Sequence, residues 1–199
     1  MSSQSTIHPY LDWAKERLDE IDATLASFEH KAAKLQADAR SKAEKATCDM
    51  RAARDAFHKS IKEHGGASEV AVASSKKALE TQWTAFEAAV PAFLDATGQH
   101  VKEVETAFQA RAEAQRKAWH EAIVKLHKSA KSFADKRRDE IEAAVKHMKV
   151  EADAAKAKLD KLDQAGGESW AAMKSALTET RTALDKAQQA VHESLKRVA

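Results

Sequence analysis

Histidine is the residue type in this chain best suited to metal binding, and nine histidines are spread along its 199 residues. A di-iron site in a helical bundle needs a Glu-x-x-His motif on each of two helices. No glutamate here has a histidine three residues later, and the nearest case is Asp55-x-x-His58. His120 and His127 share a helix face, but they lie too far apart along a helix for one ion to bridge them. The sequence therefore predicts no metal site and no cofactor.

Motifs for covalent or nucleotide chemistry are lacking as well. The chain has no G-x-S-x-G elbow, no P-loop and no dinucleotide-binding fingerprint. Its single cysteine, Cys48, has no histidine nearby, so we expect a buried or incidental thiol rather than a nucleophile. We therefore predict that the protein is not an enzyme.

Basic side chains concentrate between Arg111 and Arg138, where nine Lys or Arg residues stand beside three acidic ones. Such a stretch could contact an anionic surface, such as lipid head groups, nucleic acid or an acidic partner. The candidate contact residues are Arg116, Lys117, Lys125, Lys128 and Lys131. Acidic residues flank the stretch closely, however, and the net charge of the chain is only +2. We therefore prefer to interpret it as a solvated helix face, and we predict no specific nucleic-acid partner.

The composition favours long, thin helices as the elements that carry these residues. The chain has 43 Ala residues but only 33 Leu, Ile, Val and Phe residues together. Ala is the strongest helix former, and so little apolar bulk argues against a thick layered core. Five Gly and two Pro residues leave little room for β-hairpins. The predicted fold class is therefore all-α.

A long central helix is predicted from Ser68 to Asp163, between the pairs Gly65-Gly66 and Gly166-Gly167. Apolar or small residues recur there at alternating steps of three and four, which is typical of a coiled coil. Pro91 is expected to kink this helix, which would be about 140 Å long. In the alternative arrangement, the chain turns near Gly98 and forms a compact four-helix up-down bundle.

Amphipathic helices are expected on both sides of the central helix. The first follows a disordered polar tail over residues 1–9 and extends to about Glu63, and the last runs from Glu168 to about Val198. If each Gly-Gly pair forms a turn, the helices fold into elongated antiparallel coiled-coil hairpins. In the register of the first hairpin, Phe28 lies near Val104.

The two halves of the chain also resemble each other. A shift of 101 residues places Leu79 on Thr180 and Trp83 on Leu184. This match indicates a diverged tandem duplication. We therefore divide the chain into two helical hairpin units, over residues 10–97 and 98–199.

One zone of the central helix has no intrachain partner in the hairpin arrangement. It covers residues 122–134 and contains Ile123, Val124, Leu126 and Phe133. Uncovered apolar residues of this kind usually mark association sites. The sequence thus predicts a homo-oligomer that associates through these residues, whereas the four-helix alternative would cover them within one chain.

The N-terminal sequence MSSQSTIHP has neither a basic start nor an apolar run, so we expect no signal peptide. No stretch approaches the roughly 20 apolar residues of a membrane span. A lone cysteine is compatible with a reducing compartment. These features predict a cytoplasmic protein without a transmembrane segment.

Two segments support a family resemblance. They are Leu18-Asp19-Glu20-Ile21 and the run from Gly166 to Leu177, GGESWAAMKSAL, on either side of Ala/Lys/Glu-rich helix. This pattern resembles small bacterial coiled-coil proteins of the stress-response class, although those proteins carry one unit. The resemblance implies helical hairpins without catalytic residues. The composition alone also resembles that of phasins, which are helical proteins that coat polymer granules.

The sequence as a whole predicts a non-enzymatic, self-associating coiled-coil scaffold or stress-related structural protein. The alternative is a phasin-like protein whose amphipathic helices coat a lipid or polymer granule surface. An Ala-rich stripe buries little area per turn, which favours contact between helices over insertion into lipid.

Overall fold

A computed structural model describes residues 9–64, 69–98, 101–130, 135–165 and 169–197. These residues form six α-helices: α1 (Pro9–Ala32), α2 (Ala37–His64), α3 (Glu69–Ala96), α4 (Val101–Ala130), α5 (Asp135–Ala165) and α6 (Trp170–Arg197). The described residues include no strand, and the predicted all-α class is confirmed. Residues 1–8 of the predicted polar tail lie outside the described part of the chain.

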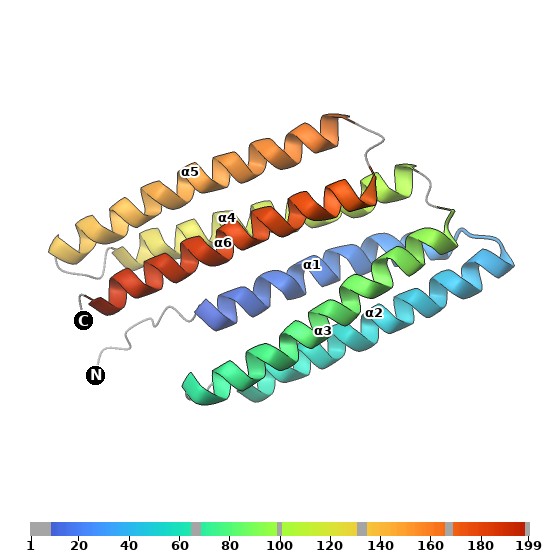
Figure 1. Ribbon diagram of the computed structural model, residues 1–199, viewed down its shortest axis with the longest axis horizontal. Coiled ribbons are helices and arrows are strands. Elements are labelled where there is room, and N and C mark those ends of the chain that lie inside the picture. Colours follow the sequence, from blue (N-terminus) through green and yellow to red (C-terminus); the bar gives the residue numbers. More distant parts are fainter. Residues whose placement is uncertain (1–8, 65–68, 99–100, 131–134, 166–168, 198–199) are drawn as a thin grey trace.

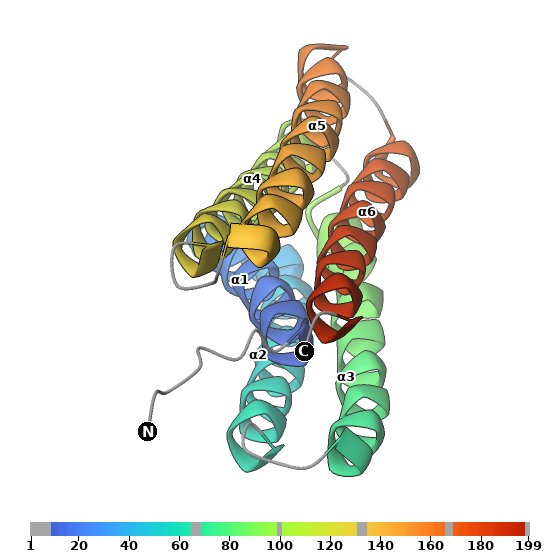
Figure 2. The same cartoon turned by 90° about the vertical axis from the view of Figure 1, so that its left-hand side faces the viewer.

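The helices form an elongated bundle in which α1 and α4 run antiparallel through the middle (Figure 1). The helices α2 and α3 pack on one side of α1, and α5 and α6 pack on the other side, against α4 (Figure 2). Two ion pairs join the central helices near opposite ends, Lys31 to Glu103 at 3.1 Å and Lys15 to Glu121 at 2.8 Å. The charged site described below lies between these two pairs.

The predicted continuous central helix is wrong, because the chain reverses between α3 and α4. Helix α3 ends at Ala96, and Gly98 has a φ angle of 80°, a conformation that favours glycine. The N–H of Gly98 donates to the carbonyl oxygen of Asp95 at 3.1 Å, which satisfies one of the last carbonyls of the helix. Pro91 lies inside α3 without ending it. The turn near Gly98 that the alternative predicted is confirmed.

A further turn, which neither arrangement predicted, separates α1 from α2. The expected single first helix is wrong, since α1 ends at Ala32 and α2 begins at Ala37. The intervening residues 33–36 include no Gly or Pro. Helix α2 folds back along α1, and Arg54 lies 2.8 Å from Asp22 across the pair. Burial of the α2 stripe against α1 and α3 thus overrides local helix propensity.

The described part of the chain therefore forms six helices rather than four, because α4 and α5 are also separate elements. Each predicted unit contains three helices, and Gly98 lies at the predicted boundary between residues 10–97 and 98–199. Helices α1 and α4 pair as the first predicted hairpin required, and the ion pair of Lys31 with Glu103 lies close to the predicted contact between Phe28 and Val104.

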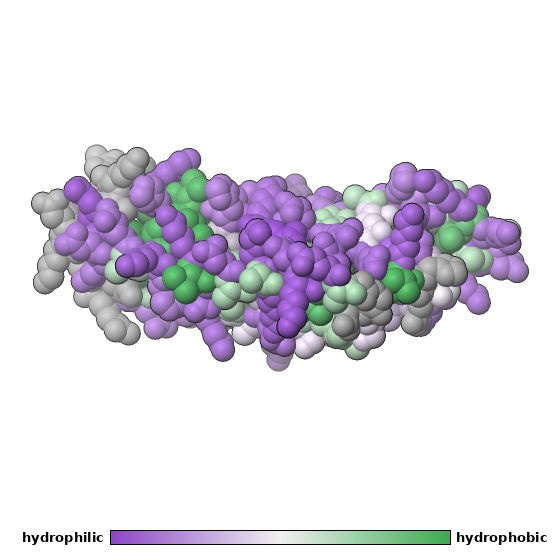
Figure 3. All heavy atoms as spheres, turned by 90° about the horizontal axis from the view of Figure 1, so that it is seen from above, coloured by the Kyte–Doolittle hydropathy of each residue, from purple (hydrophilic) through white to green (hydrophobic). Residues whose placement is uncertain are grey.

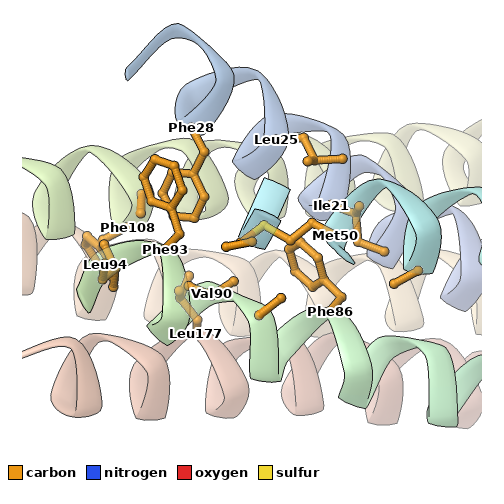
Figure 4. Close-up of a cluster of buried hydrophobic side chains, with 14 of the residues drawn as sticks. Ile21, Leu25, Phe28, Met50, Phe86, Val90, Phe93, Leu94, Phe108 and Leu177 are labelled. Atoms are coloured by element: carbon orange, nitrogen blue, oxygen red, sulfur yellow. The ribbon is translucent and has the colours of Figure 1, made fainter. Parts of the chain in front are cut away.

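The hydrophobic core extends across both halves of the chain. Its larger cluster draws residues from all six helices and includes the stacked rings of Phe28 and Phe93, whose centroids lie 3.9 Å apart (Figure 4). A smaller cluster joins α4, α5 and α6 around Trp119 and Ile141. Full burial of each large apolar side chain contributes about 1.5–3 kcal/mol. The shared core ties the two halves into one bundle.

The face of the molecule seen in Figure 3 is predominantly hydrophilic, with apolar residues in separate groups. Among the residues whose side chains are described, the exposed large hydrophobic ones are Val101 and Val150, at 54% and 63% exposure. None of the described helices combines the length and the apolar character that a membrane crossing requires. The apolar stripes of the helices are thus used mainly for packing within the chain.

Candidate functional site

The middle of the bundle contains charged side chains at positions that are normally apolar. Glu20 on α1 is 1% exposed, and Arg111 on α4 and Arg181 on α6 are 0% and 5% exposed. Charged residues are almost never buried to this extent unless they are paired. We call Glu20, Arg111, Arg181 and Glu87 of α3 the central charge cluster. It joins four of the six helices.

The carboxylate of Glu20 is surrounded by donors. Arg181 donates to it through Nε and Nη2, each at 2.8 Å, in the two-point geometry that is strongest for guanidinium and carboxylate. Arg111 donates through Nε and Nη2 at 3.1 Å, and Gln115 donates through Nε2 at 3.0 Å. Both oxygens of Glu20 are therefore fully used by hydrogen bonds.

Glu87 supplies the second carboxylate of the cluster. It accepts a short hydrogen bond from Arg111, and Lys174 lies 3.3 Å from its other oxygen. Trp83 lies close to both guanidinium groups, with the Arg181 carbon 4.5 Å and the Arg111 carbon 5.5 Å from its ring centroid. Aromatic faces stabilise cations at such distances. Arg111 and Arg181 therefore each bind a carboxylate and also lie close to the aromatic ring of Trp83.

Electrostatics within the central charge cluster keep its carboxylates ionised. Burial by itself raises the pKa of Glu20, but Arg181 and Arg111 outweigh that effect and lower the pKa to about 2. Burial likewise opposes ionisation of Glu87, yet Arg111 and Arg181 lower its pKa below the usual range. The cluster therefore has the properties of a fixed set of ion pairs between helices.

Glu16 lies one helical turn before Glu20 and has a different environment. It is 7% exposed, and Gln188 of α6 donates a short hydrogen bond to its Oε1. Burial raises the pKa of Glu16 to about 8, and the nearby charge of Asp185 adds to this effect. The guanidinium of Arg17 opposes the shift but is itself bound to Asp185 at 2.7 Å. A proton on Glu16 is therefore retained at neutral pH.

A groove of about 480 Å³ opens beside Glu16, lined by α1, α4 and Gln188. Its apolar wall consists of Ala118, Ala122 and Val124. Ion pairs between α1 and α4 border it, among them Lys125 of α4 at 2.8 Å from Asp12 of α1. The groove is thus an apolar slot with charged edges and a buried carboxyl group.

The predicted self-association residues lie at one end of α4. Leu126 is 4% exposed and, with the partly buried Ile123, packs in the cluster that α5 and α6 complete. Val124 lines the groove, and Phe133 lies outside the described residues. The expectation that this zone lacks an intrachain partner is therefore wrong for Leu126 and Ile123. Association of copies through these residues stays a prediction, but the predicted lack of intrachain partners no longer supports it.

The predicted anionic-surface residues on α4 are mostly engaged in ion pairs. Arg116 lies 2.8 Å from Asp160, Lys117 lies 3.7 Å from Glu121, and Lys125 binds Asp12. Lys128 lines the groove, and Lys131 lies outside the described residues. These contacts agree with a solvated face of mixed charge, and contact with an anionic surface stays a prediction.

The residues considered for metal or nucleophilic chemistry are dispersed. Asp55 pairs with Arg54 at 3.0 Å, and within the described ranges no group of three or more His, Cys, Asp or Glu side chains could hold a metal ion. His120 lines the groove, whereas His127 is exposed outside it. The thiol of Cys48 is free and exposed rather than buried.

Neither Glu16 nor the central charge cluster was predicted as a site from the sequence. A signal was present, because Arg111 and Gln115 occupy the gap in the apolar stripe of α4 between Phe108 and Trp119. Polar residues at stripe positions are buried when the stripe is buried, and they then need partners. The partners themselves come from other helices and could not be assigned from spacing.

The chain matches no protein-family model, no curated protein and no solved structure.

Proposed function

We propose that the protein is a non-enzymatic helical scaffold or stress-related structural protein whose copies associate. The observation that carries the structural, non-enzymatic part of this proposal is the central charge cluster, in which Glu20 is bound by Arg111, Arg181 and Gln115. Its charges join α1, α3, α4 and α6 to one another. Because buried ion pairs often add little net stability, we infer that these charges serve to fix one arrangement of the helices.

The protonation behaviour of the cluster supports a structural role over a catalytic one. A catalytic acid or base works best with a pKa near the working pH. The pKa of Glu20 is about 2, and both of its oxygens are occupied by donors. Glu16 has a pKa of about 8, but burial and the charge of Asp185 are sufficient causes for it.

The alternative, a protein that coats a lipid or polymer granule, requires the bundle to open. Leu126 and the other apolar stripe residues with described side chains pack inward, while Val101 and Val150 are exposed. Opening would separate the buried charges of Glu20 and Arg111 from their partners, which is costly in an apolar environment. The scaffold is therefore the function that the geometry favours.

Light scattering after size-exclusion chromatography tests self-association, with the chain mass of 21.8 kDa as the reference. A scaffold of associating copies should give a larger mass that increases with protein concentration. A constant monomer mass would contradict association. Substitution of Leu126 by Glu is not a clean test, because it places a charge in the core.

Co-sedimentation with anionic liposomes separates the scaffold from the surface-coating alternative. We expect the protein to remain in the supernatant at low and high salt. Strong binding that salt weakens, accompanied by loss of the near-UV signal of buried tryptophans such as Trp119, would instead indicate opening on the surface. That result would replace the scaffold by the coating function.

A further inference from the structure

Two buried side chains at the groove each have an oxygen without a hydrogen-bond partner. They are Glu16, with Oε2 unpaired, and Gln188, with Oε1 unpaired. Both residues line the groove, and their exposures are only 7% and 8%. A buried acceptor without a donor costs about 1–3 kcal/mol. A ligand that supplies donors at this point would remove that cost.

We propose that the groove binds the ammonium group of a small aliphatic amine, with Glu16 and Gln188 accepting its hydrogen bonds. The unpaired oxygen of Gln188 is an acceptor, and that of Glu16 becomes one when the carboxyl group loses its proton; an ammonium group brings three donors and the charge opposite to a carboxylate. The alkyl part of the amine would lie along Ala118, Ala122 and Val124. The proposal is independent of the scaffold function.

The size of the groove suits such a ligand. Its volume of about 480 Å³ is within the range of roughly 300–1,000 Å³ found for small-molecule pockets. The groove lies between helices of a bundle, where ligand sites commonly occur. Lys15 and Lys125 border it, but each already neutralises a carboxylate, Glu121 and Asp12 respectively. An anionic ligand would therefore compete with existing ion pairs, whereas a cation would find an unpaired acceptor.

Other charges around Glu16 affect the site. The groups that line the same groove or an adjoining cavity, or that act on Glu16 electrostatically, are Asp12, Lys15, Arg17 and Glu20 on α1, His120, Glu121, Lys125 and Lys128 on α4, and Arg181 and Asp185 on α6. Asp185 adds negative potential, whereas Lys128 adds positive potential at the groove. Replacement of Lys128 should therefore strengthen binding of a cation and weaken binding of an anion.

Proton release should accompany binding at neutral pH. The free protein holds a proton on Glu16 because burial raises its pKa to about 8, and a bound ammonium group favours the ionised carboxylate. The apparent affinity should then rise about tenfold between pH 7 and pH 9 as Glu16 ionises. It should fall again above about pH 10.4, where an aliphatic amine loses its own proton.

The test is an amide NMR titration of the full chain with n-butylamine at pH 7 and pH 9, with n-butanol and butyrate as matched neutral and anionic probes. We expect saturable shifts at Ala118, Ala122 and Val124 with the amine alone, and tighter binding at the higher pH. Equal binding of butanol would show an apolar slot without charge selection. Preferential binding of butyrate, or no saturable shift with any probe, would also overturn the proposal.

Variants test the named atoms. Glu16→Gln retains the size of the side chain, and it should weaken amine binding at pH 9 at least tenfold and remove the pH dependence. Lys128→Gln should strengthen binding a few-fold. Glu29→Gln is the control, since Glu29 lies on the same helix but is exposed and paired with Arg51. With folding verified by circular dichroism, unchanged binding in Glu16→Gln would overturn the assignment.

Discussion

Glu16 and Glu20 lie one turn apart on α1, and both are buried, at 7% and 1% exposure. Glu20 meets two arginines and an amide, whereas Glu16 meets one amide and lies near the carboxylate of Asp185. The pKa of Glu20 is about 2 and that of Glu16 is about 8. Burial acts in the same direction on both residues. The charges that face each carboxyl group therefore decide whether it is ionised.

The two residues make the stability of the bundle depend on pH in opposite directions. The folded pKa of Glu20 is below its ordinary value of 4.5, so its stabilising contribution is present above about pH 4.5 and is lost as the pH falls towards 2. The folded pKa of Glu16 is above 4.5, so its contribution is present below about pH 4.5 and is lost as the pH rises towards 8. The stabilising contribution of the central charge cluster is therefore lost in acid, and that of Glu16 is lost in base.

Replacement of Glu20 by Gln should produce the largest effect. The variant leaves Arg111 and Arg181 buried without their main counter-charge, which should lower the free energy of unfolding by about 3–5 kcal/mol. Urea denaturation at pH 7 measures the loss. Glu29→Gln breaks a pair with Arg51 in which both side chains are exposed, and it should cost less than about 1 kcal/mol. Equal losses in the two variants would show that the central charge cluster contributes no more to stability than an exposed ion pair.

Replacement of Glu16 by Gln should have the opposite sign. At pH 8 the unfolded wild type ionises Glu16, whereas the fold favours its neutral form, and this difference lowers the free energy of unfolding. The variant has no ionisable group at this position and avoids that loss. With about 1.4 kcal/mol for each pKa unit, the variant should gain roughly 4 kcal/mol at pH 8 and less than about 0.5 kcal/mol near pH 4.5. Thermal melts from pH 4.5 to pH 8 measure this gain. A gain that is independent of pH would show that Glu16 does not hold a proton in the folded state.

The parts of the fold that could be predicted are those with local signals. Periodicity and composition predicted the helices, and Gly98, with its positive φ angle, marks the turn that the alternative placed there. The turn over residues 33–36 could not be predicted, because it has no Gly or Pro and depends on the packing of α2 against α1 and α3. The length of Ala-rich helices is thus set by tertiary burial more than by local propensity.

The candidate site was less predictable than the fold. Arg111 and Gln115 interrupt an apolar stripe, which indicates buried polar groups. Glu16 instead lies beside the apolar stripe of α1, where the sequence pattern predicts an exposed side chain. Its burial depends on α6, which reaches α1 only because the chain turns at Gly98. Because the sequence predicted one continuous central helix, it could not predict the groove either.

Replacement of Asp185 by Asn should give the smallest of these effects and shows what separates the two glutamates. Asp185 raises the pKa of Glu16 and also binds Arg17, at 2.7 Å and 3.2 Å, so the variant removes a negative charge and releases a positive one. Both changes favour ionised Glu16, and its pKa should fall by about one unit. Carboxyl NMR titration measures the shift, with the resonance of Glu20 as internal control because Arg111 and Arg181 still hold it. If the pKa of Glu16 does not move, burial alone maintains its proton, and the contrast with Glu20 depends on the arginines and not on Asp185.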